Sequence, residues 1–285
     1  MSDRDLLALY GLKYNPFLPA IPSQDLWTPP GVETFFFRVE TLVMDGGFAL
    51  ISGEPGLGKS KVLQLLAARL EQIGDVVVGV MERPQSTLAD FYRELGELFG
   101  VELTPANKYG GFKALRLKWR EYIKATLFRP ALLIDEAQVM PTDTLNELRL
   151  ISSAHFDSDA LLSTVLCGDT TLPDRFRHKS LLALGSRART RLALDAFPRE
   201  ALLDFLDHLL VHAGNPSLVA DTLREILADH SAGNLRVLVG MAADLLDAAA
   251  RQQAKRLDEK LFIEVYDRKP SSRSQRGARA TRRSS

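Results

Sequence analysis

The stretch "ISGEPGLGKS", residues 51–60, decides the fold. Gly53, Gly58, Lys59 and Ser60 match the pattern G-x-x-x-x-G-K-[ST], in which a glycine-rich turn joins a strand to a helix. An apolar run precedes the turn, and a segment with helical periodicity, 61–73, follows it. Backbone N–H groups in such a turn converge at the positive end of the next helix and form an anion site. The stretch therefore predicts a phosphate-binding loop.

The side chains of this loop indicate which ligand it holds. Lys59 can reach the β- and γ-phosphates of a nucleotide, and the Ser60 hydroxyl can ligate Mg²⁺. ATP and Mg²⁺ are therefore the predicted cofactors. The expected cofactor-binding residues of the loop are Gly53, Glu54, Pro55, Gly56, Leu57, Gly58, Lys59, Ser60 and Lys61.

A second motif, "ALLIDEAQ" at 131–138, supplies two carboxylates. Four apolar residues predict a buried strand that ends in Asp135 and Glu136. Hydrolysis of a nucleotide in a phosphate-binding loop needs one carboxylate to hold Mg²⁺ and another to orient the attacking water. Asp135 is accordingly the predicted metal ligand together with Ser60. Glu136 is the predicted catalytic residue that activates water.

Strands and helices alternate along the first two thirds of the chain. Strands are expected at 46–52, 75–82, 130–138 and 160–169, which predicts an α/β fold with a parallel sheet flanked by helices. After Pro198 the pattern becomes entirely helical. The expected parts are an N-terminal segment at 1–45, a nucleotide-binding domain at 46–197, a small helical lid at 198–267 and a disordered basic tail at 268–285.

The charge of the chain is unevenly distributed. The 285 residues carry no net charge, yet 268–285 contains seven basic residues and no acidic one, as in tails that bind nucleic acid. A solubilising tail without a partner is the alternative.

The single cysteine, Cys167, excludes an internal disulfide. No apolar stretch approaches the roughly 20 residues that span a bilayer, and the N-terminus lacks the features of a signal peptide. A cytoplasmic protein without a membrane partner is expected.

Two further segments carry arginines that could take part in nucleotide hydrolysis. Residues 183–194 carry Arg187, Arg189 and Arg191, and Arg236 lies at the start of a predicted helix in 231–246. An arginine from a neighbouring subunit can stabilise charge on the γ-phosphoryl group during transfer. Taken alone, each of these residues is typical of a surface ion pair.

The order of these motifs resembles that of AAA+ ATPases. The start "YGLKYNPF" and the strand "LIDEAQ" are similar to the ExeA-like branch, which also includes transposition ATPases of the TniB, TnsC, MuB and IstB kind. The resemblance covers roughly residues 8–255 and implies an AAA+ phosphate-binding-loop fold with a helical lid. The residues that it implies are Lys59 and Ser60 in the first Walker motif, Asp135 and Glu136 in the second, Asp169 as γ-phosphate sensor, Arg187 as arginine finger, Arg236 as lid arginine, and Asn15 and Phe17 near the adenine.

Two positions depart from the pattern of that branch. "CGDTTL" stands where a sequence like "GQPEL" is expected, and "SR" replaces "QR" at the finger. Arg189 and Arg191 therefore compete with Arg187 for the finger role.

The segment from Lys108 to Arg129 holds seven basic residues and one acidic residue. Lys113, Arg116, Arg120 and Lys124 follow helical spacing and share one face, which suits contact with phosphates. The predicted DNA-binding residues are Lys108, Lys113, Arg116, Lys118 and Arg120. Since no helix-turn-helix or zinc finger is evident, sequence-tolerant binding is expected. A solvated helix face is the alternative.

The combined features predict an ATPase that regulates transposition, a form of DNA recombination. It would form a homo-oligomer, either a ring or a helical filament, on double-stranded DNA and recruit or activate a transposase. One alternative is an ExeA-type ATPase that acts on a protein or secretion partner without binding DNA. Another is a signalling or toxin-linked switch.

Overall fold

The computed structural model describes residues 3–84, 87–101, 108–125, 128–154 and 159–266. These form two compact units. The α/β unit comprises the described residues of 21–202 together with 232–236. The helical unit comprises those of 1–20, 203–231 and 237–285. The predicted basic tail and the Lys108 side chain lie outside the described part of the chain.

The α/β unit is built on a five-stranded parallel sheet with the order β2-β3-β6-β1-β7. The three central strands, β3, β6 and β1, are apolar and almost entirely buried, as expected for strands inside a parallel sheet. This confirms the parallel sheet predicted from the sequence. The strands are β1 (Gly47–Gly53), β2 (Val76–Met81), β3 (Arg129–Ile134), β6 (Ser163–Gly168) and β7 (Ala188–Leu194).

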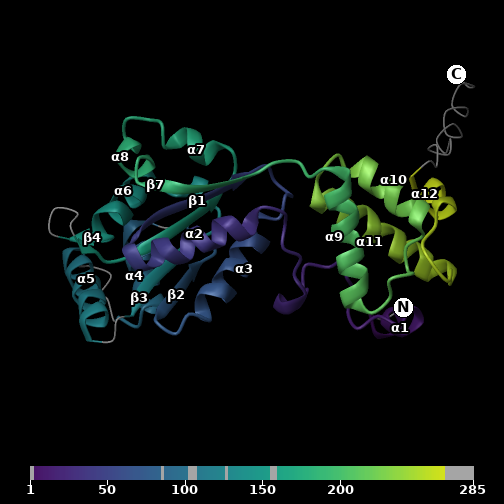
Figure 1. Cartoon of the computed structure of the whole chain (residues 1–285), viewed down its shortest axis with the longest axis horizontal. Helices are drawn as coiled ribbons and strands as arrows, with labels where there is room; N and C mark the ends of the chain where they lie inside the picture. Colours follow the sequence, from purple (N-terminus) through teal and green to yellow (C-terminus); the bar gives the residue numbers. More distant parts are fainter. Residues whose placement is uncertain (1–2, 85–86, 102–107, 126–127, 155–158, 267–285) are drawn as a thin grey trace, which may run out of the picture. The chain divides into compact units, whose positions relative to one another are not determined.

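Alternate residues of each strand enter two hydrophobic cores, one on either face of the sheet. Ala49 and Ile51 of β1 pack in the core beneath α2 and α3. Phe48 and Leu50 pack in the other, which includes Trp119. Figure 1 shows these helices along the sheet. They are α2 (Val32–Asp45) and α3 (Lys59–Glu71) on the first face, and α4 (Leu88–Leu98), α5 (Lys108–Ala125) and α6 (Thr142–Ile151) on the second.

The edge strand β7 has no counterpart among the strands expected from the sequence. Its interior alternates between exposed and half-buried residues, and Arg189 and Arg191 are both exposed. A strand with one partner and a solvated face lacks the continuous apolar run of a central strand. For this reason its sequence reads as an arginine-bearing segment rather than as part of the sheet.

Short elements connect the strands at both ends of the sheet. The expected strand at 130–138 ends earlier, at Ile134, and a 3₁₀ turn, η2 (Ala137–Val139), follows the two acidic residues. A small antiparallel pair, β4 (Ser153–Ala154) and β5 (Asp159–Ala160), leads into β6. The remaining short elements are η1 (Ser23–Asp25), α7 (Thr171–Arg175) and α8 (Leu182–Gly185).

The helical unit includes the start of the chain. The Tyr10 hydroxyl donates to the carbonyl of Ala254 at 3.0 Å, and the Asn215 side chain donates to the carbonyl of Tyr10 at 2.8 Å. The N-terminal segment expected at 1–45 is therefore divided between the two units. The helices are α1 (Asp3–Tyr10), α9 (Arg199–Ala213), α10 (Asp221–Ser231), α11 (Leu235–Gln252) and α12 (Glu259–Tyr266). Among the described residues, no helix combines the length and the apolar character that crossing a bilayer requires.

Candidate active site

The phosphate-binding loop lies at the carboxyl end of β1. Gly56 and Gly58 have φ angles of +90° and +85°, a left-handed conformation that glycine adopts without steric cost. Gly58 is the residue before the first turn of α3, so the loop delivers the chain directly to the helix N-terminus. The N–H groups of that terminus face the loop and favour an anion.

Lys59 is the first residue of α3 and is only 9% exposed. Its Nζ donates to the carbonyl oxygen of Glu54 at 3.0 Å, which folds the side chain back over the loop. An ammonium group has three donors, so two more can serve phosphate oxygens. The Lys61 side chain instead donates to the Gln64 carboxamide at 3.2 Å, so Lys61 would contact a nucleotide through its backbone N–H.

Asp135 and Glu136 follow β3, which is separated from β1 by β6 alone. Neighbouring strands lie about 4.8 Å apart, so the acidic strand end and the loop are about 10 Å apart across the sheet edge. Hydroxyl and carboxylate oxygens are ligands that Mg²⁺ accepts, so Ser60 and Asp135 suit the ion. Among the described residues, no group of three or more His, Cys, Asp and Glu side chains forms a metal site by itself.

Cys167, on β6, shows that the loop and the acidic strand end converge. Burial raises the pKa of its thiol well above the usual value, the Asp135 carboxylate beside it raises the pKa further, and Lys59 opposes the shift. The thiol is fully buried and remains protonated. Asp135 and Lys59 therefore act on the same point at the end of β6.

Glu136 has an unusual backbone conformation. Its φ of 50° and ψ of 34° are left-handed, and its N–H donates to Asp135 Oδ1 at 2.9 Å. Non-glycine residues in this region cost of order 1–3 kcal/mol and concentrate at functional sites. The conformation turns the exposed Glu136 side chain out of the line of β3.

Asp169, the predicted phosphate sensor, has another role in this structure. Its Oδ1 accepts hydrogen bonds from the Thr171 N–H at 2.9 Å and from the Thr171 hydroxyl at 2.5 Å, which fixes the start of α7. The neighbouring Thr170 hydroxyl donates to Glu54 Oε1 at 3.2 Å and ties the end of β6 to the loop. The sensor role of Asp169 stays a prediction, and Thr170 is a contact that the sequence patterns do not single out.

Asn234 fastens the start of α11 to the loop. Its Nδ2 donates to the carbonyl of Pro55 at 2.9 Å, and its Oδ1 accepts from the N–H of Arg236 at 3.0 Å. The same N–H also donates to the carbonyl of Gly56 at 3.1 Å. The backbone of Arg236, the predicted lid arginine, is thus bound to the loop itself. Its side chain is exposed.

Arg187, the first candidate for the arginine finger, precedes β7 at the other end of the sheet from the loop. Ala188 pairs with Phe48 at the start of β1, whereas Leu194 pairs with Gly53 at the loop. With a rise of about 3.3 Å per residue, Arg187 is more than 15 Å from phosphates bound to its own loop. Arg191 is held by the carbonyls of Gly185 and Ala188 at 2.9 and 2.8 Å. Any contact of Arg187 with a γ-phosphate would therefore involve a second copy of the chain.

Two other predicted contacts are Asn15 and Phe17. Phe17 is 3% exposed, its N–H donates to Asn15 Oδ1 at 3.0 Å, and both residues belong to the helical unit. Their placement near the adenine stays a prediction.

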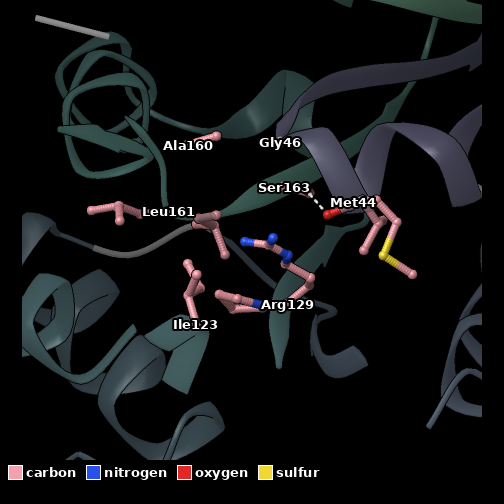
Figure 2. Close-up of a pocket in the computed structure, with 10 residues that line it drawn as sticks. Met44, Gly46, Ile123, Arg129, Ala160, Leu161 and Ser163 are labelled. Atoms are coloured by element: carbon pink, nitrogen blue, oxygen red, sulfur yellow. Dashed lines mark hydrogen bonds between the residues drawn. The ribbon is translucent and has the colours of Figure 1, made fainter. Parts of the chain in front are cut away.

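A small pocket opens at the amino ends of β3 and β6, where Arg129 extends beside Ile123 and Leu161 (Figure 2). Ligands of open α/β sheets bind at the carboxyl ends, so this pocket is not the nucleotide site.

The basic face of α5 is only partly available. Arg116 donates to the carbonyl of Ser153 at 2.6 Å, and Arg120 is 4.0 Å from Asp159, so both are engaged by the β4–β5 pair. Lys113 and Lys124 are exposed. Lys118 lies on a different side of the helix from this face, because helical positions advance by about 100° per residue. The predicted DNA-binding residues therefore do not form one uniform stripe.

Comparison with known proteins identifies the fold. Residues 43–176 match the model of the AAA domain family AAA_22. The ORC2 protein of Aeropyrum pernix superimposes with a TM-score of 0.68 at 14% identity, over 89% of this chain and 71% of that chain. The fold is that of the AAA+ ATPases. The Aeropyrum pernix ORC1 protein in complex with DNA shares this AAA+ fold, with a TM-score of 0.65 at 19% identity over 88% of this chain and 67% of that one.

A curated relative agrees with part of the resemblance seen in the sequence. General secretion pathway protein A of Aeromonas hydrophila is 27% identical over 229 residues, which are 78% of this chain and 41% of that protein. This supports the similarity to the ExeA-like branch. The chain spans about two fifths of the length of this relative. The resemblance to transposition ATPases stays a prediction.

Proposed function

We propose that this protein is an ATP-hydrolysing switch that assembles with other copies of itself and acts on double-stranded DNA. The observation that carries the proposal is that the buried Lys59, after β1, lies at the same edge of the sheet as Asp135 and Glu136, which follow β3. In this arrangement Lys59 and the N-terminus of α3 bind the phosphates. Ser60 and Asp135 hold Mg²⁺, which when bound neutralises charge on the phosphate oxygens. Glu136 orients water and accepts its proton.

Replacement of the loop lysine tests the nucleotide site. Lys59→Ala is expected to weaken ATP binding about 100-fold, because it removes charge-assisted hydrogen bonds to two phosphates. Titration with a fluorescent ATP analogue measures the loss. Lys61→Ala is the matched control, since its Nζ bonds to Gln64, and its affinity should stay within about twofold. Equal affinities of Lys59→Ala and the unaltered protein would contradict the proposed site.

DNA is the proposed partner because of the charge on α5. Lys113 and Lys124 are exposed, while Arg116 and Arg120 are anchored beside them by the β4–β5 pair. Contacts of this kind follow phosphates without reading bases. An AAA+ neighbour in the solved structures is an ORC1 protein in complex with DNA. A transposase that receives the DNA-bound assembly is the proposed protein partner.

An ATPase that acts on a protein or secretion partner is the second candidate. The similarity to General secretion pathway protein A favours it. The engagement of Arg116 and Arg120 within the fold also favours it, because it leaves fewer cations for phosphates. Binding to a random-sequence duplex in the presence of an ATP analogue, ADP or no nucleotide distinguishes the two candidates. Hydrolysis without binding in any state would favour the protein partner.

The double variant Lys113→Glu/Lys124→Glu tests whether α5 is the DNA surface. We expect it to weaken duplex binding about tenfold or more and to lower the slope of log affinity against log salt by about 2, since each phosphate contact contributes about 0.9. Fluorescence anisotropy across salt concentrations measures both quantities. The charge-matched control is Lys255→Glu/Lys260→Glu, at exposed positions of the helical unit. Equal losses in the two double variants would argue against a localised DNA surface on α5.

A further inference from the structure

The side chain of Gln138 bridges the candidate base and the end of a neighbouring strand. Its Nε2 donates to Glu136 Oε2 at 2.6 Å. Its Oε1 accepts from the backbone N–H of Asp169, directly after β6, at 3.2 Å. One carboxamide therefore uses its donor on the carboxylate and its acceptor on the sheet.

The surroundings fix Gln138 in place. Arg175 donates to the carbonyl of Gln138 through one nitrogen and to the carbonyl of Met140 through the other, the latter at 2.8 Å. Gly168 leaves room for the carboxamide, since a Cβ at that position would lie 2.6 Å from Gln138 Oε1. The backbone of Gln138, which belongs to η2, is thus held by α7, and its side chain is held at the end of β6.

We propose that Gln138 is a positioning residue that orients Glu136 for attack by water. The inference rests on the proposed function, because it concerns the residue that activates water at that site. Glu136 is exposed and itself adopts a left-handed backbone conformation, so its side chain would otherwise sample several rotamers. The bond from Gln138 occupies Oε2 and leaves Oε1 for the water.

The chemistry of a carboxamide suits this task. It donates a hydrogen bond without a positive charge, so it restrains the carboxylate without the ion pairing that would make a carboxylate a weaker base. An arginine or lysine at this position would provide such an ion pair. Gln138 Oε1 also accepts a hydrogen bond from the Asp169 N–H. Through Gln138, the position of Glu136 is therefore tied to the end of β6, where the phosphates would lie.

The variant Gln138→Glu tests the inference. It keeps the shape of the side chain and an acceptor for the Asp169 N–H, but it replaces the donor that faces Glu136 with a second carboxylate. We expect kcat to fall about tenfold or more, because misplacing a reacting group lowers the rate. KM for ATP and the dissociation constant of ADP should stay within about twofold, since Gln138 touches neither the loop nor its lysine.

A double-variant comparison separates positioning from general support of the fold. If Gln138 acts through Glu136, then Gln138→Glu costs nothing further in a Glu136→Gln background, measured in single turnovers. An equal cost in both backgrounds would overturn the inference, as would a loss confined to KM. Gln138→Met, which lacks the donor, repeats the test should Gln138→Glu unfold at a lower temperature. An unchanged kcat in Glu136→Gln would instead overturn the proposed role of Glu136, and the inference with it.

Discussion

Glu136→Gln is expected to lower kcat for ATP hydrolysis about 1000-fold while ATP binding is retained, because general-base catalysis contributes factors of this order. The carboxamide has the size of the carboxylate and can still accept the hydrogen bond that Gln138 donates to Oε2. It cannot accept a proton from water at neutral pH. The variant should therefore accumulate with ATP bound and remain assembled.

Phosphate release at saturating ATP measures this loss, and analogue titration measures binding in the same samples. Asp143→Asn provides a matched control, because Asp143 is an exposed carboxylate at the start of α6. Its kcat should equal that of the unaltered protein. A Glu136→Gln variant that hydrolyses ATP at the normal rate would show that another group activates the water.

The sequence predicts the loop and the acidic strand end because both depend on local patterns. The glycines at 56 and 58 permit one type of turn, and the apolar run 131–134 can only be a buried strand or a buried helical segment. Parallel topology then brings the carboxyl ends of the strands to one edge. These steps use residues that are close in the chain, so the structure reproduces them.

The contacts that complete the site depend on residues far apart in the chain. Gln138 meets Asp169 across 31 positions, and Asn234 meets Pro55 across 179. An asparagine ahead of a helix predicts an N-cap, but it does not predict that the amide also binds a loop carbonyl. Partners of this kind are set by the strand order and by the return of residues 232–236 to the loop, which periodicity does not encode.

The basic face of α5 shows a related limit. Helical spacing correctly places Arg116 and Arg120 near one another, but it does not indicate that Ser153 and Asp159 lie against them. A count of charges therefore overestimates the cations that a face offers to a partner. In the same way, the sequence does not indicate that Asp169 accepts hydrogen bonds from Thr171 at the start of α7.

Arg187→Ala is expected to lower kcat about 1000-fold, the effect of removing an arginine finger. Arg187 precedes β7 and its own loop follows β1, so the two lie at opposite ends of this pair of strands. This placement allows a more specific test. If Arg187 is an arginine finger, it would serve the loop of another copy. ATPase activity of mixtures of inactive variants therefore reports whether the sites are shared.

An equimolar mixture of Arg187→Ala and Lys59→Ala should recover about a quarter of normal activity, because one interface in four joins an intact loop to an intact arginine supplied in trans. A mixture of Lys59→Ala and Glu136→Gln should recover nothing, since both changes lie on the loop side of the interface. A mixture of Arg189→Ala and Lys59→Ala applies the same test to Arg189, the neighbouring candidate for the arginine finger. Arg191 is the weakest competitor, because the carbonyls of Gly185 and Ala188 already hold its guanidinium. Absence of recovery in the first mixture would mean that each copy completes its own site, which the distance along β7 argues against.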